Sequence, residues 1–388
     1  MSDHPAAPSW VEVDLAAVRH NLRALAALLG PRCDAWAVVK ADAYGHGAAP
    51  VARAALEGGA LGLAVASLEE ALALREAGLQ APVLLLSAGE PHRAEEVVRR
   101  DLIQAACEPA MVEALSAAAV ALGRPARVHL KLDTGMSRLG VPAEEAAAFA
   151  QSHLSRPGLQ MEGVFSHLAT AEDPDPSFAW EQMRRLEDAL VQLRAAGLDP
   201  GMRHLANSAA ALRFPAMRLD AVRVGLLVYG LTPDAPELAP LDLRPALTWR
   251  TRLAFVREAP AGASVSYGRT FVTRRPSRLA VLPLGYADGY PRQASNRAHV
   301  LVRGTPCPVV GMVCMDHVIV DITDAPGARM GDEAVLIGRQ GRSRVTANHL
   351  ARWAGTVVHA CTTAIGRRVA RVYCDEGRPL DPGLGPER

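Results

Sequence analysis

The chain has 388 residues, of which 49% are hydrophobic and 21% charged, and its formal net charge is +1. This composition is ordinary for a globular protein of two or three domains and excludes a disordered or fibrous chain. No block of like charge points to a nucleic-acid or membrane-surface partner, and no uncharged apolar window of about 18 residues predicts a membrane span.

The six cysteines are scattered and include no Cys-x-x-Cys pair. This spacing argues against structural zinc and favours a reducing compartment. Residues 1–10 lack the basic start and the apolar stretch of a signal peptide. We therefore expect a cytoplasmic protein without a metal site.

Short apolar runs alternate with helical segments over the first 240 residues. Polar, glycine or proline residues bound each run, as they bound buried parallel strands. Helices are expected over 67–77, where Ser67 and Glu70 form a capping-box pattern, and over 177–196. The predicted strands are 35–40, 61–66, 82–87, 102–107, 127–133, 161–167, 203–206 and 221–225.

Eight strand–helix units in about 200 residues predict an α/β fold, a (β/α)8 barrel of the TIM type over residues 10–240. A doubly wound open sheet is the alternative, but no Gly-x-Gly-x-x-Gly turn follows the first strand. Four prolines between residues 233 and 245 mark a linker.

Beyond the linker the pattern predicts a mostly β C-terminal domain over 241–388, with residues 1–9 packing near it. Glycine and proline turns separate its strand-like segments, and a helix is expected over 346–354. The strand-like segments are 281–284, 299–303, 308–313, 318–321 and 334–338.

Lysine is rare in this sequence. Lysines and arginines together number 42, but only Lys40 and Lys131 are lysines. Arginine can replace lysine wherever only a positive charge is needed, but its guanidinium stays protonated and cannot act as a nucleophile or a base. We therefore expect at least one of the two lysines to do chemistry.

Several polar residues stand at the predicted carboxyl ends of the barrel strands, the ends that face the active site in such barrels. Any one of them could be a capping or hydrogen-bonded structural residue. Together they predict a site on one rim, made of Lys40, Lys131, Asp133, His167, Asn207, Ser208 and Arg223.

Two long motifs carry a family resemblance. Residues 37–47 read AVVKADAYGHG, which resembles the pyridoxal phosphate (PLP) signature of alanine racemases, and residues 129–140 read HLKLDTGMSRLG, which is similar to a second block of that family. Further blocks follow in family order, so that the resemblance covers nearly the whole chain. They are SH at 166–167, ANSA at 206–209, VRVG at 222–225, VSYG at 265–268, GYADGY at 285–290 and CMDH at 314–317.

The resemblance implies a PLP-binding barrel followed by a β domain, in a homodimer whose active sites draw on both chains. The implied reaction is the interconversion of L- and D-alanine, which supplies D-alanine for peptidoglycan precursors. Lys40 would form a Schiff base with PLP and act as the base on one face of the substrate Cα. Tyr267 of the partner chain would act on the other face, assisted by a hydrogen-bonded line through His167 to Arg223.

The resemblance also implies which residues bind the cofactor and the substrate. Arg223 would face the pyridine nitrogen of PLP, and as a donor it can bond only an unprotonated nitrogen, which leaves the carbanion weakly stabilised. Arg138 would bond the phenolic oxygen of PLP, and the backbone N–H of Met315 would bond the substrate carboxylate. The remaining cofactor-binding residues are Tyr44, His167, Asn207, Ser208, Gly225, Leu226 and Arg367.

Lys131 would carry a carbamate that fixes Arg138, as in some alanine racemases. Glu172, Tyr286 and Arg292 match positions that line the entry corridor. The sequence departs from the family in three places: Glu172 replaces a frequent Asp, Met312 a corridor Arg of some members, and Arg367 a Tyr of some members.

Plainer interpretations remain open for single residues. Ser208 could be a helix N-cap, Arg223 could form a salt bridge, and Tyr267 could be a turn aromatic. Lys131 could be an unmodified lysine paired with Asp133, or with a chloride beside Arg138.

Two other functions compete with a racemase. A non-catalytic PLP carrier resembles only the barrel, and the C-terminal motifs count against it. An amino-acid decarboxylase places a carboxylate opposite the ring nitrogen, where this sequence has Arg223.

Overall fold

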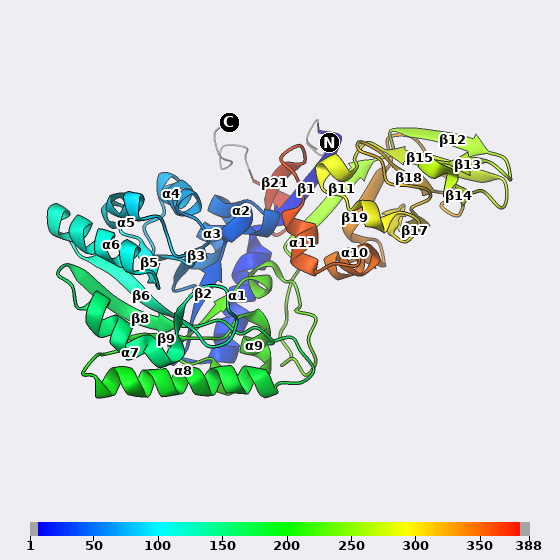
Figure 1. Ribbon diagram of the computed structural model, residues 1–388. Coiled ribbons are helices and arrows are strands. Elements are labelled where there is room, and N and C mark those ends of the chain that lie inside the picture. Colours follow the sequence, from blue (N-terminus) through cyan, green and yellow to red (C-terminus); the bar gives the residue numbers. More distant parts are fainter. Residues whose placement is uncertain (1–6, 381–388) are drawn as a thin grey trace. The chain divides into compact units, whose positions relative to one another are not determined.

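The computed structural model describes residues 7–380, which form two compact units (Figure 1). The first unit comprises residues 18–43 and 51–244. The second contains residues 7–17, 44–50 and 245–380 of the described chain. No helix within residues 7–380 is long and apolar enough to cross a membrane.

The first unit is a closed parallel barrel. Its strands pair in the order β2-β3-β4-β5-β6-β8-β9-β10, and β10 pairs back with β2. The predicted (β/α)8 barrel is therefore confirmed, and the open sheet is excluded. The strands are β2 (Asp34–Val38), β3 (Gly62–Val65), β4 (Val83–Leu85), β5 (Ile103–Ala106), β6 (Ala126–Asp133), β8 (Leu159–Phe165), β9 (Met202–His204) and β10 (Ala221–Val224).

Helices follow the barrel strands. The predicted capping box is present in α4 (Leu68–Glu76): the hydroxyl of Ser67 accepts the N–H of Glu70, and the Glu70 carboxylate accepts the N–H of Ser67. The longest helix, α8 (Ser177–Ala195), matches the prediction over 177–196. The other α-helices of this part of the chain are α1 (Leu15–Leu29), α2 (Lys40–Gly45), α3 (Ala48–Glu57), α5 (Ala94–Arg99), α6 (Pro109–Leu122), α7 (Ala146–Phe149) and α9 (Ser208–Arg213).

The second unit is mostly β. In its largest sheet β1 (Ser9–Asp14) lies between β11 (Leu247–Arg252) and β21 (Ala370–Asp375). Residues 10–17, which the expected boundary at residue 10 assigned to the barrel, thus belong to this unit. The sheet continues through β16 (His299–Val302), β17 (Thr305–Pro308), β19 (Glu333–Gln340), β20 (Ser343–Val345) and β22 (Arg378–Pro379).

Two smaller sheets and two helices complete this unit. The predicted helix over 346–354 is present as α10 (Ala347–Ala354), capped by Thr346. The predicted strand over 308–313 is wrong beyond Val309, which forms a single bridge to Val320, because Gly311 at φ +76° turns the chain. The other elements are β12 (Phe255–Ala259), β13 (Ser264–Val265), β14 (Phe271–Val272), β15 (Ser277–Leu282), β18 (Val318–Asp321) and α11 (Val358–Thr363).

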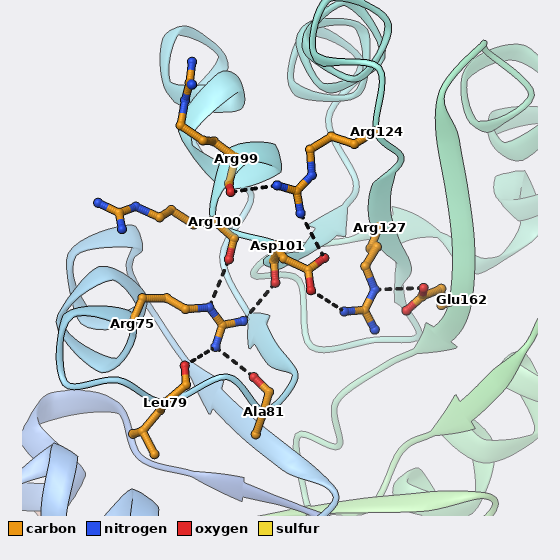
Figure 2. Close-up of polar contacts among 9 residues, drawn as sticks. All are labelled: Arg75, Leu79, Ala81, Arg99, Arg100, Asp101, Arg124, Arg127 and Glu162. Carbon is orange, nitrogen blue, oxygen red and sulfur yellow. Dashed lines mark hydrogen bonds and ion pairs between the residues drawn. The ribbon is translucent and has the colours of Figure 1, made fainter.

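A buried arginine ties the loops at the amino ends of β4 and β5 (Figure 2). The guanidinium of Arg75, on α4, donates to the carbonyls of Leu79 and Ala81 at 2.8 Å and to those of Arg100 and Asp101 at 2.9 Å. This end of the barrel lies opposite the strand ends that face active sites, so we assign the cluster to stability.

We predict that Arg75→Met lowers the free energy of unfolding by about 3 kcal/mol, because it removes the donor from four carbonyls that are buried or half-buried. Arg100→Met is the matched control, since the exposed Arg100 contributes its carbonyl rather than its guanidinium to the cluster. Urea unfolding of the two variants measures the difference. Equal unfolding midpoints would show that Arg75 does not stabilise the barrel.

Candidate active site

The barrel brings the predicted rim residues of the first unit to one end. Lys40 follows β2, Lys131 lies near the end of β6, and His167 follows β8. Ser208 follows β9, and Arg223 lies in β10. Because the strands of a closed parallel barrel all end on one rim, residues far apart in sequence are gathered there.

The chain after Lys40 is strained. Residues 41–44 of α2 (Lys40–Gly45) have φ between 51° and 55°, so this turn is left-handed. Such a conformation costs L-residues about 1–2 kcal/mol each. Runs of this kind persist only where the surroundings hold them, and they are typical of functional sites. The strand predicted over 35–40 gave no sign of this turn, because no glycine occurs between residues 35 and 44.

Arg223 is buried in the barrel without an acidic partner among residues 7–380. Its Nη1 donates to Nδ1 and to the carbonyl of His204, both at 3.0 Å. Its Nη2 donates to Nδ1 of His167 at 3.2 Å and to the carbonyls of Ser166 at 2.6 Å and Leu205 at 3.2 Å. The salt-bridge interpretation of Arg223 is therefore wrong.

These contacts determine where the imidazole protons lie. A guanidinium only donates, so the Nδ1 atoms of His167 and His204 must accept, and their protons lie on Nε2. Nε2 of His204 then donates to Nδ1 of His129 at 2.8 Å. Sequence analysis missed His129 and His204, although both stand in or next to predicted strands, where a buried imidazole requires a polar partner.

Burial and the positive charge of Arg223 keep the three histidines neutral. Burial, with smaller effects of nearby cations, lowers the pKa of His129 and that of His167 to about 3, and the pKa of His204 falls well below its usual value. Burial also lowers the pKa of Arg223 to about 9, which leaves it protonated at neutral pH. The site thus holds one charged donor between neutral imidazoles.

Both lysines of the rim are easier to deprotonate than an exposed lysine. Burial and the charge of Arg138 lower the pKa of Lys40, while Glu70 opposes them. Burial lowers the pKa of Lys131 to about 8; the nearby thiol of Cys107 raises it, and the charges of Arg223, Arg138 and Lys40 lower it further. Each amine therefore loses its proton at a lower pH than an exposed lysine does, and Lys131 is about half neutral near pH 8.

Lys131 is not paired with Asp133. Its Nζ donates to the carbonyl of Leu86 at 2.7 Å. Asp133 instead accepts the backbone N–H groups of the following turn through Oδ1, at residues Gly135, Met136 and Ser137. The pairing of Lys131 with Asp133 is therefore wrong, and the alternative of a chloride beside Arg138 stays open.

Ser208 is not the cap of α9. Asn207 is the N-cap, since its Oδ1 accepts the N–H of Ala210 at 3.0 Å. The hydroxyl of Ser208 is thereby available for a distant contact and accepts the N–H of Gly225 at 3.0 Å. Two predicted cofactor-binding residues, 17 positions apart, are thus in contact.

The loop of Glu172 is held by a second arginine that sequence analysis missed. Arg213, at the end of α9, donates to the carbonyls of Ala171, Asp173 and Pro174. Glu172 itself is exposed on this loop.

Several other predicted residues lie in the second unit. Tyr267 exposes 72% of its surface, Met315 53% and Tyr286 43%. Ser266, directly before Tyr267, has φ +61° and donates its hydroxyl to the carbonyl of Met312 at 2.6 Å. The remaining predicted residues of this unit are Tyr44, Arg292 and the exposed Arg367.

Family models match both halves of the chain. The N-terminal domain of alanine racemase matches residues 13–233, and the C-terminal domain matches residues 246–373. The chain belongs to the alanine racemase family. It is 48% identical to the alanine racemase of Symbiobacterium thermophilum over 371 residues, which cover 95% of this chain and 98% of that protein. The resemblance carried by the motifs is confirmed.

Solved structures of alanine racemases share this fold. That of the D-cycloserine-producing Streptomyces lavendulae matches with a TM-score of 0.90 and 42% identity, covering 96% of this chain and 98% of that chain. That of Bacillus anthracis with bound L-Ala-P matches with a TM-score of 0.90 and 35% identity, covering 97% and 98% respectively.

We predict that Ala41→Gly raises the free energy of unfolding by about 1 kcal/mol, because glycine removes the cost of a positive φ. The matched control is Ala26→Gly in the regular helix α1, which should lower it by about 1 kcal/mol. Denaturant unfolding of both variants tests this reversal of sign. If Ala41→Gly destabilises as much as Ala26→Gly, residue 41 does not adopt the left-handed conformation.

Proposed function

We propose that this chain interconverts L-alanine and D-alanine with PLP as its cofactor, in the cytoplasm, as a source of D-alanine for peptidoglycan precursors. Family membership supports this function. The observation that carries it is the buried guanidinium of Arg223 on the same rim as Lys40, satisfied without a carboxylate.

The donors on the rim fit PLP. The Nη groups of Arg223 all bond protein acceptors, whereas its Nε–H makes no hydrogen bond within the part of the chain that the structure describes. One donor is thus left for a ring nitrogen that can only accept. When bound, PLP withdraws electrons from the substrate Cα and acidifies its proton. An amino-acid decarboxylase would need a carboxylate in place of Arg223, so this donor favours the racemase.

The phosphate would bind where Ser208 meets Gly225. In our proposal the N–H of Leu226 adds a donor there, and Asn207 supports the turn by capping α9. The family resemblance adds Tyr44 and Arg367 to the phosphate site. By the same resemblance Arg138 would bond the phenolic oxygen of PLP, and the backbone N–H of Met315 would bond the substrate carboxylate.

The two proton transfers require a base on each face of the substrate Cα. Lys40 suits one face, since burial and Arg138 favour its neutral amine. Tyr267 of a partner chain would act on the other face. His167 would assist, because the contact with Arg223 leaves its proton on Nε2. The exposure of Tyr267 and Met315 in a single chain is consistent with a homodimer that shares its sites.

The reaction is tested by following Cα hydrogen exchange and chirality together in heavy water. The parent protein should exchange the α-proton of L-alanine and form D-alanine. Lys40→Arg should abolish both, together with the visible absorbance of the bound cofactor, because a guanidinium cannot replace the amine. Lys131→Arg is the matched control, since it removes the other lysine and should keep that absorbance. Exchange without D-alanine from the parent protein would contradict the racemase.

If Tyr267 is the second base, a variant without its hydroxyl should treat the two enantiomers of alanine differently. Tyr267→Phe should lose racemisation yet still exchange the α-proton of one enantiomer, which by the resemblance is D-alanine, because Lys40 still serves its own face. Exchange rates measured separately with each enantiomer test this. Equal residual rates with both would contradict two bases.

Two variants that are each inactive test whether the site is shared between subunits. When Lys40→Ala and Tyr267→Phe subunits are mixed, one of the two sites in a hybrid dimer receives both intact residues, so part of the activity should return. Light scattering and subunit exchange of labelled chains provide the control. No recovery despite confirmed exchange would mean that each site lies within one chain.

We further propose that Lys131 carries a carbamate. The cations Arg223, Arg138 and Lys40 all act on its amine, so an anion at this position would be favoured. The neutral amine adds to carbon dioxide and releases a proton, a reaction that arginine cannot perform. The carbamate oxygens would accept hydrogen bonds from Arg138 and fix it. Glu172, Tyr286 and Arg292 would line the entry to the site.

The carbamate should form more readily as the pH rises, because the amine, with a pKa of about 8, is neutral above that pH. With 13C-labelled bicarbonate, NMR should detect one carbamate that is absent from Lys131→Arg. Lys131→Ala should lose roughly tenfold in activity and regain part of it with a short carboxylate or chloride. A lysine amine that stays unmodified in labelled bicarbonate at mildly alkaline pH would contradict the carbamate.

A further inference from the structure

One side chain holds the first peptide of the left-handed turn. The N–H of Ala41, the residue after Lys40, donates to Oε1 of Glu70 at 2.6 Å. Oε2 of Glu70 accepts the N–H of Ala66 at 2.8 Å and that of Ser67 at 3.2 Å. One carboxylate thus links the start of α4 to the peptide that follows Lys40, and the two segments lie side by side (Figure 1).

The residues before Lys40 are held by the barrel instead. The N–H of Val39 donates to the carbonyl of Ala64 at 2.9 Å, and the carbonyl of Val38 accepts the hydroxyl of Tyr229 at 2.7 Å. The peptide on the other side of Lys40 cannot use a strand partner, because the chain has left the sheet there. Its contact with Glu70 therefore fixes the direction of the Lys40 backbone on that side.

Glu70 also acts on Lys40 through its charge. The groups that interact electrostatically with Lys40 are Glu70, Arg138, Lys131 and His167. Among the described residues that act on the pKa of Lys40, Glu70 is the acidic side chain. It opposes burial and Arg138, which both favour the neutral amine. This charge is not needed for capping, because a serine hydroxyl or a neutral amide also caps a helix.

We propose that Glu70 is a positioning residue for Lys40, which anchors the strained peptide after the lysine and acts on its amine through a negative charge. This role goes beyond the helix cap that the sequence predicts. It rests on the proposed function only in treating Lys40 as the reactive amine.

Three variants separate the charge of Glu70, its hydrogen bond to Ala41 and the N-terminal cap of α4. Glu70→Gln removes the charge but keeps one oxygen that can accept the N–H of Ala41. Glu70→Ala removes both. Ser67→Ala weakens the cap and leaves Glu70 intact. Glu69→Gln is the matched control, because Glu69 stands in the same helical turn, is exposed and pairs with Arg93.

Because the chain has only two lysines, the acylation of one can be compared with that of the other. Acylation of the full-length chain without cofactor, followed by peptide mass spectrometry over a range of pH, gives the labelling of Lys40 relative to Lys131 within one molecule. In buffer free of carbon dioxide Lys131 stays a free amine that Glu70 does not affect directly. Its own labelling in each variant is compared with that in the parent chain, because the charge of Lys40 acts on it.

In Glu70→Gln the curve of Lys40 labelling against pH should shift to lower pH, because the loss of the negative charge favours the neutral amine. A shift of half a pH unit corresponds to a factor of about three. The labelling of Lys40 relative to Lys131 near pH 8 should therefore rise at least about threefold. Ser67→Ala and Glu69→Gln should match the parent chain. In the holoenzyme, Glu70→Ala should lower kcat about tenfold with little change in KM, because the lysine amine is displaced while the substrate contacts remain.

A labelling curve of Glu70→Gln that coincides with those of Glu69→Gln and the parent would overturn the proposal. So would the same shift in Ser67→Ala, because it would assign the effect to the cap. If Glu70→Ala does not fold, Glu70→Gln alone decides. The labelling does not depend on alanine turnover, so a parent chain without racemase activity would contradict the proposed function and leave this test intact.

Discussion

The positive charge of Arg223 inside the barrel is the constraint on which the rim depends. Its guanidinium is satisfied by backbone carbonyls and two imidazole nitrogens rather than by a carboxylate. The charge therefore stays uncompensated, and it contributes to the lowered pKa of Lys131 and of the histidines at 129, 167 and 204. A carboxylate at this point would cancel that field and make the neutral forms harder to maintain.

At the other end of the barrel a second guanidinium, that of Arg75, also donates to backbone carbonyls, but it has a structural role. Arg75 also lies among backbone carbonyls, but every acceptor belongs to a loop before a strand, and no imidazole takes part. There the guanidinium joins loops (Figure 2). At the rim Arg223 joins the imidazoles of His167 and His204 and fixes which nitrogen of each carries the proton. The difference follows from the direction of the strands, whose carboxyl ends carry the polar side chains.

Strained backbone adjoins both proposed bases. A left-handed turn follows Lys40, and Ser266 at φ +61° precedes Tyr267. In each case a side-chain hydrogen bond holds the strained segment: Glu70 accepts from Ala41, and the hydroxyl of Ser266 donates to Met312. A backbone held in this way restricts the directions that the side chains of Lys40 and Tyr267 can take, whereas a flexible loop would leave them free.

The sequence by itself determined the barrel strands, the capping box at Ser67 and the family motifs, because burial periodicity and cap chemistry are local properties of the chain. Only the tertiary structure decided that Asn207 and not Ser208 caps α9, that His129 bonds His204, and that β1 joins the sheet of the second unit. These outcomes depend on contacts between residues far apart in sequence. The positive φ after Lys40 also appears only in the tertiary structure, since an alanine by itself favours the right-handed region, and the N–H of Ala41 there contacts Glu70, 29 positions away.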